Sequence, residues 1–450
     1  MNPFIVKKII YPLHEFLVGR NTMKFLGELE KSQWLSPPEI KELQLRNLKN
    51  LLKHAYVNVP YYKRIFDERG IKVDDIKSLY DIVKLPLLSR ENIRNNLENL
   101  IARNWRKKLF LYNTGGSTGH PLIFYKDKQR AGYDMSAKIR ARRWWDIDLG
   151  DKEVLLWGSP IELSKQDKLK TFRDRLMNVL LLPAFDLTPE SILKYLQILK
   201  EYKPKFIYSY ATVLYRLSRF AKEQKIDMKG LNLKAVISTA EVLHEHYREL
   251  IREVFNCPVV NEYGARDGGL IAYECPQGEM HLTDDCILVE ILDANNQPAK
   301  EGENGDIVIT HLESYGMPLI RYKIGDRGSL LNKKCSCGRG LSLIKMIEGR
   351  NNDFVVTKDG RLIHCLFFIY IIREIPGVAQ FRIIQKSFDE LQIQIVKEPN
   401  FDTSAIKIIE EKIKKITGER IKIEFEFKEE IPLEKSGKYR WIISEITSGE

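Results

Sequence analysis

The stretch LYNTGGSTGHPLIFYK, residues 111–126, places a glycine- and hydroxyl-rich turn between two apolar runs that favour strands. Glycine tolerates positive φ and close backbone approach, so the N–H groups of such a turn can point inward, and the hydroxyls add further donors. We expect the turn to bind an anion, with a polyphosphate the best fit, although a plain Gly/Ser turn is the alternative. It is not a Walker loop, because GxxxxGK[ST] is absent. The donors belong to Thr114, Gly115, Gly116, Ser117, Thr118 and Gly119.

Length and composition predict a globular protein of two or more domains. The chain has 450 residues, more than one ordinary core accommodates, with 44% hydrophobic and 30% charged residues. No run reaches the roughly 18 apolar residues of a membrane span. The start, MNPFIVKKIIYPLHEFLVG, lacks the apolar segment and cleavage site of a signal peptide. The sequence therefore predicts a cytoplasmic protein, either a monomer or a homodimer.

The net charge of +11 does not indicate a nucleic-acid-binding protein, because lysines alternate with acids along the chain. A basic cleft for ATP and a weak contact with an anionic membrane surface explain the excess equally well. The six cysteines would stay reduced in a cytosolic chain, which favours metal binding over disulfides.

Hydrophobic periodicity divides the chain into three parts. Residues 1–100 favour helices, one of them starting at the cap Ser36-Pro37-Pro38-Glu39 and ending before Pro60. Residues 101–349 alternate short apolar runs with amphipathic helices, which predicts an α/β core with parallel strands. From residue 282 short β runs replace this alternation, and residues 350–450 predict a small α+β unit. Leu362–Ile372 is too short for a membrane span and is expected to be a buried element.

Further motifs follow the glycine-rich turn in a fixed order. They are STAE (238–241), NEYGARDGG (261–269), YKIGDRG (322–328), EGRNND (348–353) and PLEKSGKYR (432–440). In this order the chain resembles the acyl-CoA-synthetase-like, adenylate-forming superfamily. Within it the chain is most similar to phenylacetate–coenzyme A ligases and to their branch of capsular polysaccharide biosynthesis proteins. The resemblance implies a large α/β N-terminal domain of several subdomains and a small, mobile C-terminal α+β lid.

The resemblance also implies roles for individual residues. Lys438 would contact the α-phosphate and the carboxylate, Asp267 would help to hold Mg²⁺, and Arg350 would lie near phosphate and ribose. Asp326 would accept both ribose hydroxyls, and the turn at 114–119 would bind the β- and γ-phosphates. The remaining ATP-binding residues would be Ala240, Glu241, Tyr263 and Gly264.

The chain departs from the family pattern in three places. Asp267 stands where a glutamate is usual, and Asn352 replaces the usual hinge aspartate. Aspartate remains a hard oxygen ligand but is one methylene shorter, and asparagine tolerates the unusual backbone angles of a hinge. The segment KDGRLIHCLFF after the hinge matches the thiol tunnel of phenylacetate ligases poorly. Adenylation is thus better supported than thioester formation with coenzyme A.

Two further groups of residues complete the expected site. The acyl pocket is expected near Trp157, Gly158, Tyr208, Ser209 and Tyr210, where aromatic rings suit an aryl or short apolar acid but also suit an ordinary core. Three thiols and one imidazole form a donor set that suits structural Zn²⁺, and phenylacetate-ligase-like proteins carry a similar arrangement. The alternative is a set of buried core residues. The donors are Cys275, His281, Cys335 and Cys337.

These expectations define two hypotheses. The first is an ATP-dependent ligase that activates a small carboxylic acid as an acyl-adenylate, releases pyrophosphate, and passes the acyl group to a thiol, amine or hydroxyl. The acceptor would be coenzyme A, a carrier protein or a glycan, in keeping with cell-surface polysaccharide biosynthesis. The second is an ATP-independent or non-catalytic relative that acts as a hydrolase or a carrier-binding module. Pyrophosphate release in the presence of ATP and Mg²⁺ discriminates between them.

Overall fold

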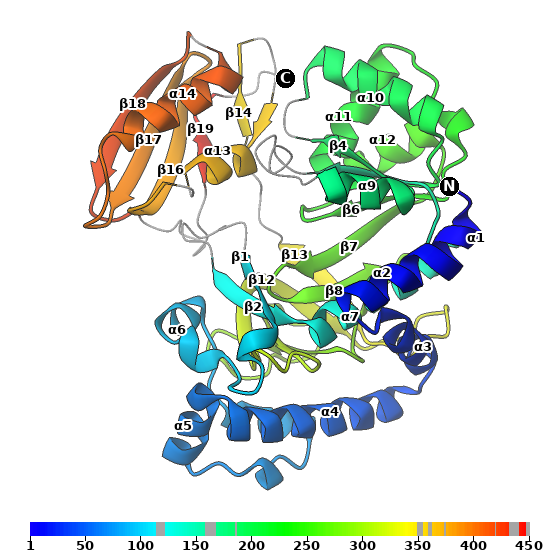
Figure 1. Ribbon diagram of the computed structural model, residues 1–450, viewed down its shortest axis with the longest axis vertical. Coiled ribbons are helices and arrows are strands. Elements are labelled where there is room, and N and C mark those ends of the chain that lie inside the picture. Colours follow the sequence, from blue (N-terminus) through cyan, green and yellow to red (C-terminus); the bar gives the residue numbers. More distant parts are fainter. Residues whose placement is uncertain are drawn as a thin grey trace.

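The fold is built on one large mixed sheet, flanked by helices and followed by a separate small sheet (Figure 1). A computed structural model describes residues 1–113, 122–157, 168–184, 187–348, 354–358, 362–372, 375–418, 420–431 and 441–446. Among these residues, no helix is long and apolar enough to cross a membrane. The mixed α/β architecture agrees with the fold class predicted from the sequence.

The first hundred residues are mainly helical. Helix α4 (Pro37–Asn58) begins with a capping box in which the Ser36 N–H and hydroxyl donate to Glu39 at 2.7 and 2.6 Å. Pro60 has no N–H to continue α4, and it instead occupies the first turn of α5 (Pro60–Arg69). The other segments are α1 (Pro3–Ile5), the π-helical η1 (Val6–Ile10), α2 (Tyr11–Val18), α3 (Thr22–Ser32), α6 (Arg90–Asn95) and the 3₁₀ turns η2 (Val73–Asp75), η3 (Leu79–Lys84), η4 (Glu98–Leu100) and η5 (Arg106–Lys108).

Half of the large sheet is parallel, as the alternation of apolar runs and helices predicts. Its strands lie in the order β7-β6-β5-β3-β4 and pair in parallel throughout. The helices α10, α11 and α12 gather beside these strands (Figure 1). The bounds are β3 (Glu153–Trp157), α9 (Lys168–Leu176), β4 (Val179–Pro183), α10 (Pro189–Tyr202), β5 (Phe206–Tyr210), α11 (Ala211–Glu223), η6 (Lys229–Leu231), β6 (Ala235–Thr239), α12 (Glu245–Phe255) and β7 (Val259–Ala265).

The other half of the sheet is antiparallel and continues in the order β8-β9-β13-β12-β11-β10. At its middle, β9 and β13 are joined through a single residue pair, Leu343 with His281. The hydrogen-bonded ladder of the sheet by itself therefore connects the strands on the two sides of this pair only weakly. The bounds are β8 (Gly269–Glu274), β9 (Met280–Leu282), β10 (Ile287–Leu292), β11 (Gly305–His311), β12 (Tyr322–Leu331) and β13 (Leu343–Glu348).

A separate hairpin carries the glycine-rich turn. Strands β1 (Leu109–Asn113) and β2 (Ile123–Asp127) pair antiparallel from Leu109 with Asp127 to Asn113 with Ile123. The turn at 114–121 lies outside the described residues, but the strands that enter and leave it are paired up to its base. Helix α7 (Lys128–Arg143) follows at once, with the Asp127 side chain accepting from the N–H of Arg130 at 2.8 Å.

The C-terminal part forms a four-stranded sheet in the order β18-β17-β16-β19. Strands β17 and β18 are parallel and joined by α14, while β16 and β17 form a hairpin. Within the apolar segment after residue 362, Phe367 and Phe368 of α13 are buried, as predicted for a core element. The bounds are β14 (Phe354–Val356), β15 (Leu362–His364), α13 (Cys365–Ile372), β16 (Val378–Ser387), β17 (Glu390–Lys397), α14 (Ala405–Thr417), β18 (Lys422–Lys428) and β19 (Ile442–Ser444).

A buried ion pair ties the N-terminal helices to the large sheet. Arg140 of α7 contacts Asp285, which lies between β9 and β10, and both side chains are only 1% exposed. The Ser32 hydroxyl at the end of α3 donates to the same carboxylate at 2.5 Å. Three elements far apart in sequence thus meet on one buried carboxylate.

We predict that Arg140→Leu lowers the free energy of unfolding by about 3–5 kcal/mol, because it leaves the Asp285 charge buried without a counter-ion. The control is Arg219→Leu, which breaks the exposed Arg219–Glu223 pair and should cost less than about 1 kcal/mol. Urea unfolding of both variants measures the difference. Equal losses would mean that Asp285 does not depend on Arg140.

Candidate functional site

Some of the residues predicted for the site lie outside the described parts of the chain. These are the turn at 114–119, Gly158, Arg350, the hinge residue Asn352 and Lys438. The remaining candidates are all described, and they fall into a nucleotide group, an acyl group and a metal group.

Two tyrosine–aspartate hydrogen bonds lock the motifs NEYGARDGG and YKIGDRG together. The Tyr263 hydroxyl donates to Asp326 Oδ2 at 3.0 Å, and the Tyr322 hydroxyl donates to Asp267 Oδ2 at 2.6 Å. Each motif supplies one tyrosine and, four residues later, one aspartate. The two bonds therefore run in opposite directions between the same two segments, although β8, β9 and β13 separate β7 from β12 in the sheet. The two motifs therefore come into contact across three intervening strands.

The two aspartates differ in their surroundings. Asp326 is half-buried, whereas Asp267 is 3% exposed and lies 3.8 Å from the Arg90 guanidinium. The main-chain carbonyl of Asp267 also accepts from Arg130, a fully buried side chain. Asp326 thus combines a fixed position with access to solvent. Asp267 is a buried carboxylate with one oxygen already hydrogen-bonded and a cation nearby.

The STAE segment is held by a helix terminus. Ala240 has the left-handed φ of +65°, and the Glu241 carboxylate accepts from the N–H and the hydroxyl of Thr212 at 2.8 and 2.7 Å. Thr212 lies in the first turn of α11, where N–H groups lack partners within the helix. The negative charge of Glu241 at this end is stabilised by the helix dipole. Glu241 thereby fixes the exposed backbone at Ala240.

Gly264 marks a close backbone approach beside Tyr263. A Cβ at this position would lie 2.8 Å from the main-chain oxygen of Gly269, on the neighbouring strand β8. The register of β7 and β8 also shifts between Tyr263 and Gly264. Only glycine fits here without displacing the strand that carries Tyr263.

The aromatic residues predicted for the acyl pocket pack against one another. The Trp157 ring stacks on Tyr210, with centroids 4.2 Å apart, and lies 5.8 Å from the Tyr208 ring. Ser209 is fully buried, and its hydroxyl donates to the Leu156 carbonyl at 3.0 Å, so it serves the sheet. The rings thus gather at the ends of β3 and β5, directly before the residues at 158–167.

Beside this aromatic group lies a buried ionic cluster that the sequence analysis did not find. Glu262 Oε1 accepts from the Tyr208 hydroxyl at 2.6 Å and from Thr239 at 3.2 Å, and it lies 3.4 Å from the Lys138 ammonium. Burial tends to lower the pKa of Lys138, but Glu262 and Tyr208 outweigh it and hold that pKa above its usual range. The Lys138 side chain is 34% exposed although Glu262 is 3% exposed. The ammonium therefore lies between a buried carboxylate and solvent.

The sequence carries one signal of this cluster. Glu262 lies two residues after the apolar pair Val259-Val260, and a charge so close to a buried apolar run needs a partner. Nothing in the sequence identifies Lys138 as that partner, because it comes from α7, more than a hundred residues earlier. The pairing depends on tertiary packing alone.

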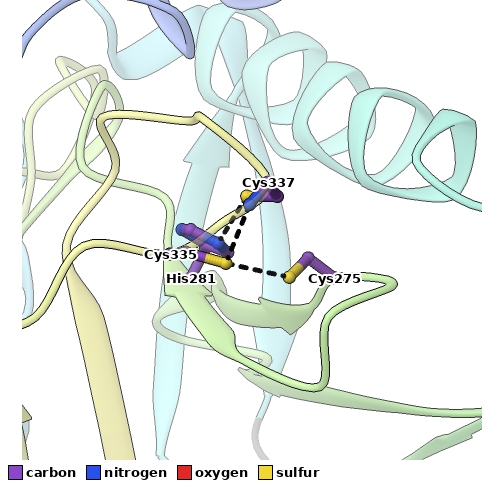
Figure 2. A group of neighbouring side chains, drawn as sticks. All are labelled: Cys275, His281, Cys335 and Cys337. Atoms are coloured by element: carbon purple, nitrogen blue, oxygen red, sulfur yellow. Dashed lines mark hydrogen bonds between the residues drawn. The ribbon is translucent and has the colours of Figure 1, made fainter.

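The four predicted metal ligands lie together (Figure 2). Their ligand atoms are all within 4.8 Å of one another, with 3.6 Å between the sulfurs of Cys275 and Cys335 and 3.2 Å from Cys337 Sγ to His281 Nε2. A tetrahedral zinc site with bonds of about 2.3 Å to sulfur spaces its sulfurs by about 3.8 Å. The donor set and its spacing therefore fit a four-coordinate metal ion.

The surroundings of the tetrad favour the tautomer and the protonation states in which its side chains bind metals. His281 Nδ1 lies 3.1 Å from the Leu341 carbonyl, to which it donates in the tautomer that leaves Nε2 towards the thiols. Burial lowers the pKa of His281 to about 4, so the imidazole is neutral at pH 7. Burial raises the pKa of Cys337, but hydrogen bonds from Arg339 more than offset this and hold it below its usual value. A neutral imidazole and an acidified thiol are the forms that bind metals.

The tetrad also lies at the weakest point of the large sheet. Cys275 and His281 belong to the β8–β9 hairpin, and Cys335 and Cys337 to the connection between β12 and β13. These are the two segments on either side of the single pair that joins β9 to β13. An ion bound by all four residues would connect the two groups of strands.

Comparison with known proteins identifies the same relatives over most of the chain. Protein CapK of Staphylococcus aureus is 26% identical over 439 residues, covering 96% of this chain and 94% of CapK. Phenylacetate–coenzyme A ligase of Escherichia coli is 25% identical over 345 residues, covering 74% of this chain and 76% of that enzyme. The family model of the CapK C-terminal domain matches residues 355–445. The chain is thus similar to CapK and to phenylacetate–coenzyme A ligases over most of its length.

Solved structures of ligases share the fold of this chain. A 2-hydroxyisobutyryl-CoA ligase in complex with 2-HIB-AMP and CoA has a TM-score of 0.63 at 20% identity, covering 92% of this chain and 91% of that one. The same ligase in its postadenylation state, bound to R3-HIB-AMP, has a TM-score of 0.61 at 19% identity and equal coverage. The CapK-like chain therefore shares the overall fold of these ligases.

We predict that substitutions of Glu262 destabilise the protein to a degree that depends on the interactions they remove. Glu262→Leu removes the acceptor of Tyr208 and the charge that faces Lys138, so it should lower the free energy of unfolding by about 3–5 kcal/mol. Glu262→Gln keeps an acceptor and should cost about 1–2 kcal/mol. The matched control is Glu253→Gln in the exposed Lys222–Glu253 pair, which should cost less than about 1 kcal/mol. Chemical denaturation measures these losses. Equal losses of unfolding free energy in Glu262→Leu and Glu262→Gln would contradict the role of the hydrogen bonds.

Proposed function

We propose that this CapK-like protein is an AMP-forming ligase that activates a small carboxylic acid as an acyl-adenylate and then transfers the acyl group to coenzyme A. Several of its relatives are named phenylacetate–coenzyme A ligases, and a ligase of the same fold binds an acyl-AMP together with CoA. A screen of aryl, fatty, amino and sugar acids by pyrophosphate exchange would identify the acid.

The observation that carries the proposal is the pair of tyrosine–aspartate bonds between NEYGARDGG and YKIGDRG. A carboxylate accepts several hydrogen bonds, so Asp326 can bind Tyr263 and still accept the two ribose hydroxyls. The Tyr263 ring and the Ala240–Glu241 backbone would then flank the adenine. Because these groups are held before ATP arrives, nucleotide binding would cost little reorganisation.

The remaining roles concern charge. Adenylation brings a carboxylate to the α-phosphate of ATP, so two anions must meet, and positioned cations supply most of the rate. Lys438 and Arg350 would provide fixed positive charges, and the turn at 114–119 would bind the leaving pyrophosphate. Mg²⁺ would be held through Asp267, whose carboxylate has oxygen lone pairs beyond the one that Tyr322 uses. Asn352 would act as the hinge between the two half-reactions.

The proposal predicts that one substitution lowers the rate of adenylation and that another weakens ATP binding. Lys438→Ala should slow adenylate formation about 100-fold or more, because the ammonium acts mainly on the transition state, while the Kd for ATP changes less than about threefold. Asp326→Ala removes a charged acceptor of the ribose and should weaken ATP binding about 10- to 100-fold. Single-turnover kinetics and ATP titration measure the two effects. Wild-type rates in Lys438→Ala would favour the ATP-independent alternative.

We also propose that Cys275, His281, Cys335 and Cys337 bind structural Zn²⁺. With four protein ligands the ion would have no open position, so it would hold the sheet together rather than take part in the reaction. Its place beside the single β9–β13 pair supports this role.

Elemental analysis of protein purified without added metal should find about one zinc per chain. Cys335→Ser/Cys337→Ser should abolish most of it and lower the melting temperature, because metal-binding energy contributes to folding. Cys257→Ala is the control, since Cys257 is buried in a different core cluster and should not affect zinc content. Zinc that persists in the double variant would place the metal elsewhere.

A further inference from the structure

The first helix of the chain exposes an apolar face to solvent. Segments α1, η1 and α2 form one continuous helix over residues 3–18, along the edge of the molecule (Figure 1). Phe16 and Leu17 are 81% and 74% exposed. The other exposed residues recur at helical spacing on the same side, so the group forms one stripe. This N-terminal apolar stripe consists of Ile5, Ile9, Leu13, Phe16 and Leu17, with Phe4 beside it.

The inward face of the same helix is partly polar. Glu15 is 4% exposed and accepts from Arg20 at 2.7 Å and from the N–H of Thr22 at 3.2 Å. Tyr11 is buried and packs with Leu26 of α3. A helix of a water-soluble protein normally buries its apolar stripe and exposes its charges. Here two large apolar side chains point outwards next to a carboxylate that is buried.

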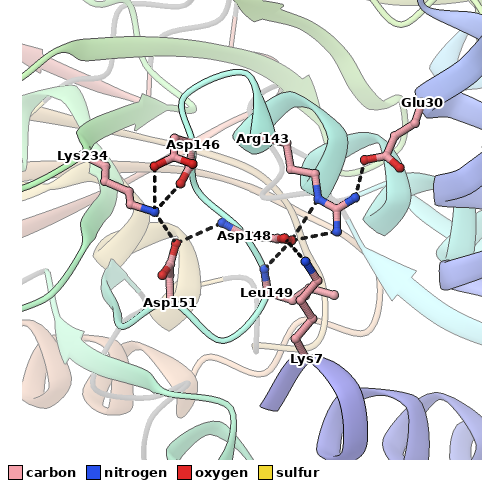
Figure 3. A network of polar contacts seen from close by, with 8 residues as sticks. All are labelled: Lys7, Glu30, Arg143, Asp146, Asp148, Leu149, Asp151 and Lys234. Carbon is pink, nitrogen blue, oxygen red and sulfur yellow. Dashed lines mark hydrogen bonds and ion pairs between the residues drawn. The ribbon is translucent and has the colours of Figure 1, made fainter. Parts of the chain in front are cut away.

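Polar contacts fix this orientation (Figure 3). Lys7 donates to Asp148 at 2.5 Å, and Asp148 also accepts from Arg143, which in turn pairs with Glu30 of α3. A second anchor lies nearer the start, where Pro3 packs so closely on Gly150 that a Cβ there would lie 2.4 Å from the Pro3 carbonyl. The helix is held at several points along its length, so the exposed stripe is a fixed feature of the surface.

Exposed lysines accompany the stripe. Lys8 lies on the same helix, and Lys24 lies in the following helix α3. Burial lowers the pKa of His14, and the charges of Arg20 and of Arg173 in α9 lower it further. Phe172 of α9 is itself exposed. The helix that carries the stripe thus also carries an exposed lysine, Lys8.

We propose that the N-terminal apolar stripe and the exposed lysines that accompany it dock the protein on an anionic lipid bilayer, with the helix lying in the plane of the interface. Interfacial helices of this kind place an apolar face among the acyl chains and basic residues at the headgroups. The charge pattern favours lipid over a second copy of the chain, because two copies meeting at this face would bring like charges together. The proposal does not depend on the ligase activity.

Co-sedimentation of the full chain with vesicles tests the proposal. We expect stronger binding to phosphatidylcholine vesicles that contain about 30% phosphatidylglycerol than to phosphatidylcholine alone, and a decrease with added salt. Phe16→Ser/Leu17→Ser should lower the partition coefficient at least about tenfold, because two large apolar side chains no longer enter the bilayer. Lys8→Glu/Lys24→Glu should lower binding to the anionic vesicles only.

The matched control is Val57→Ser/Tyr80→Ser, which removes two exposed apolar residues away from the stripe and should leave vesicle binding unchanged. Thermal melting of each variant confirms that it is folded. Wild-type protein that stays in the supernatant with both kinds of vesicle would overturn the proposal. So would sedimentation velocity that shows a wild-type dimer, dissociated by Phe16→Ser/Leu17→Ser, without vesicle binding. That result would assign the stripe to a second copy.

Discussion

The two hydrogen bonds that exchange a tyrosine and an aspartate between NEYGARDGG and YKIGDRG organise the centre of this protein. They connect Tyr263 with Asp326 and Tyr322 with Asp267, at the ends of strands that are not neighbours in the sheet. Each bond has an aspartate as acceptor, and bonds to charged groups contribute about 1.5–3 kcal/mol. Losing either bond would leave one buried or half-buried carboxylate short of a donor. These contacts thus hold the two motifs together and fix the position of the candidate ribose-binding carboxylate.

A metal ion bound by the Cys/His tetrad would impose a second constraint on the same sheet. The ladder that joins its two groups of strands narrows to one pair, Leu343 with His281, and His281 is itself a predicted metal ligand. The Tyr–Asp bonds and the tetrad both bridge the segments around β7–β9 and β12–β13, at separate places. With an ion bound, two bridges would fix the relative orientation of the strands, whereas one would allow rotation. The candidate nucleotide-binding residues on β7 and β12 would then keep their spacing without a longer ladder between β9 and β13.

The sequence was most informative where local chemistry decides the structure. The cap at Ser36, the helix break at Pro60 and the alternation of strands and helices after residue 150 follow from propensity and periodicity, and each is present. The tetrad residues were found because thiols and imidazole are a distinctive donor set. The sequence could not indicate that Lys138 faces Glu262, or that Arg140 meets Asp285, since such pairs depend on packing between distant elements. The domain boundaries near residues 100 and 350 remain predictions.

The orientation of the first helix is the least expected feature from the sequence, and energetics explain why it matters. Fully burying Phe16 and Leu17 would stabilise the fold by about 1.5–3 kcal/mol for each side chain. The partly exposed ion pair of Lys7 with Asp148 contributes less than about 1 kcal/mol. The Glu15 carboxylate is more deeply buried, but its pairing with Arg20 mainly offsets the cost of burying the Glu15 charge. Within a single chain in water, these terms do not favour an outward apolar stripe. They favour it once a second apolar phase covers Phe16 and Leu17, since the same polar anchors then hold the stripe in position for that surface.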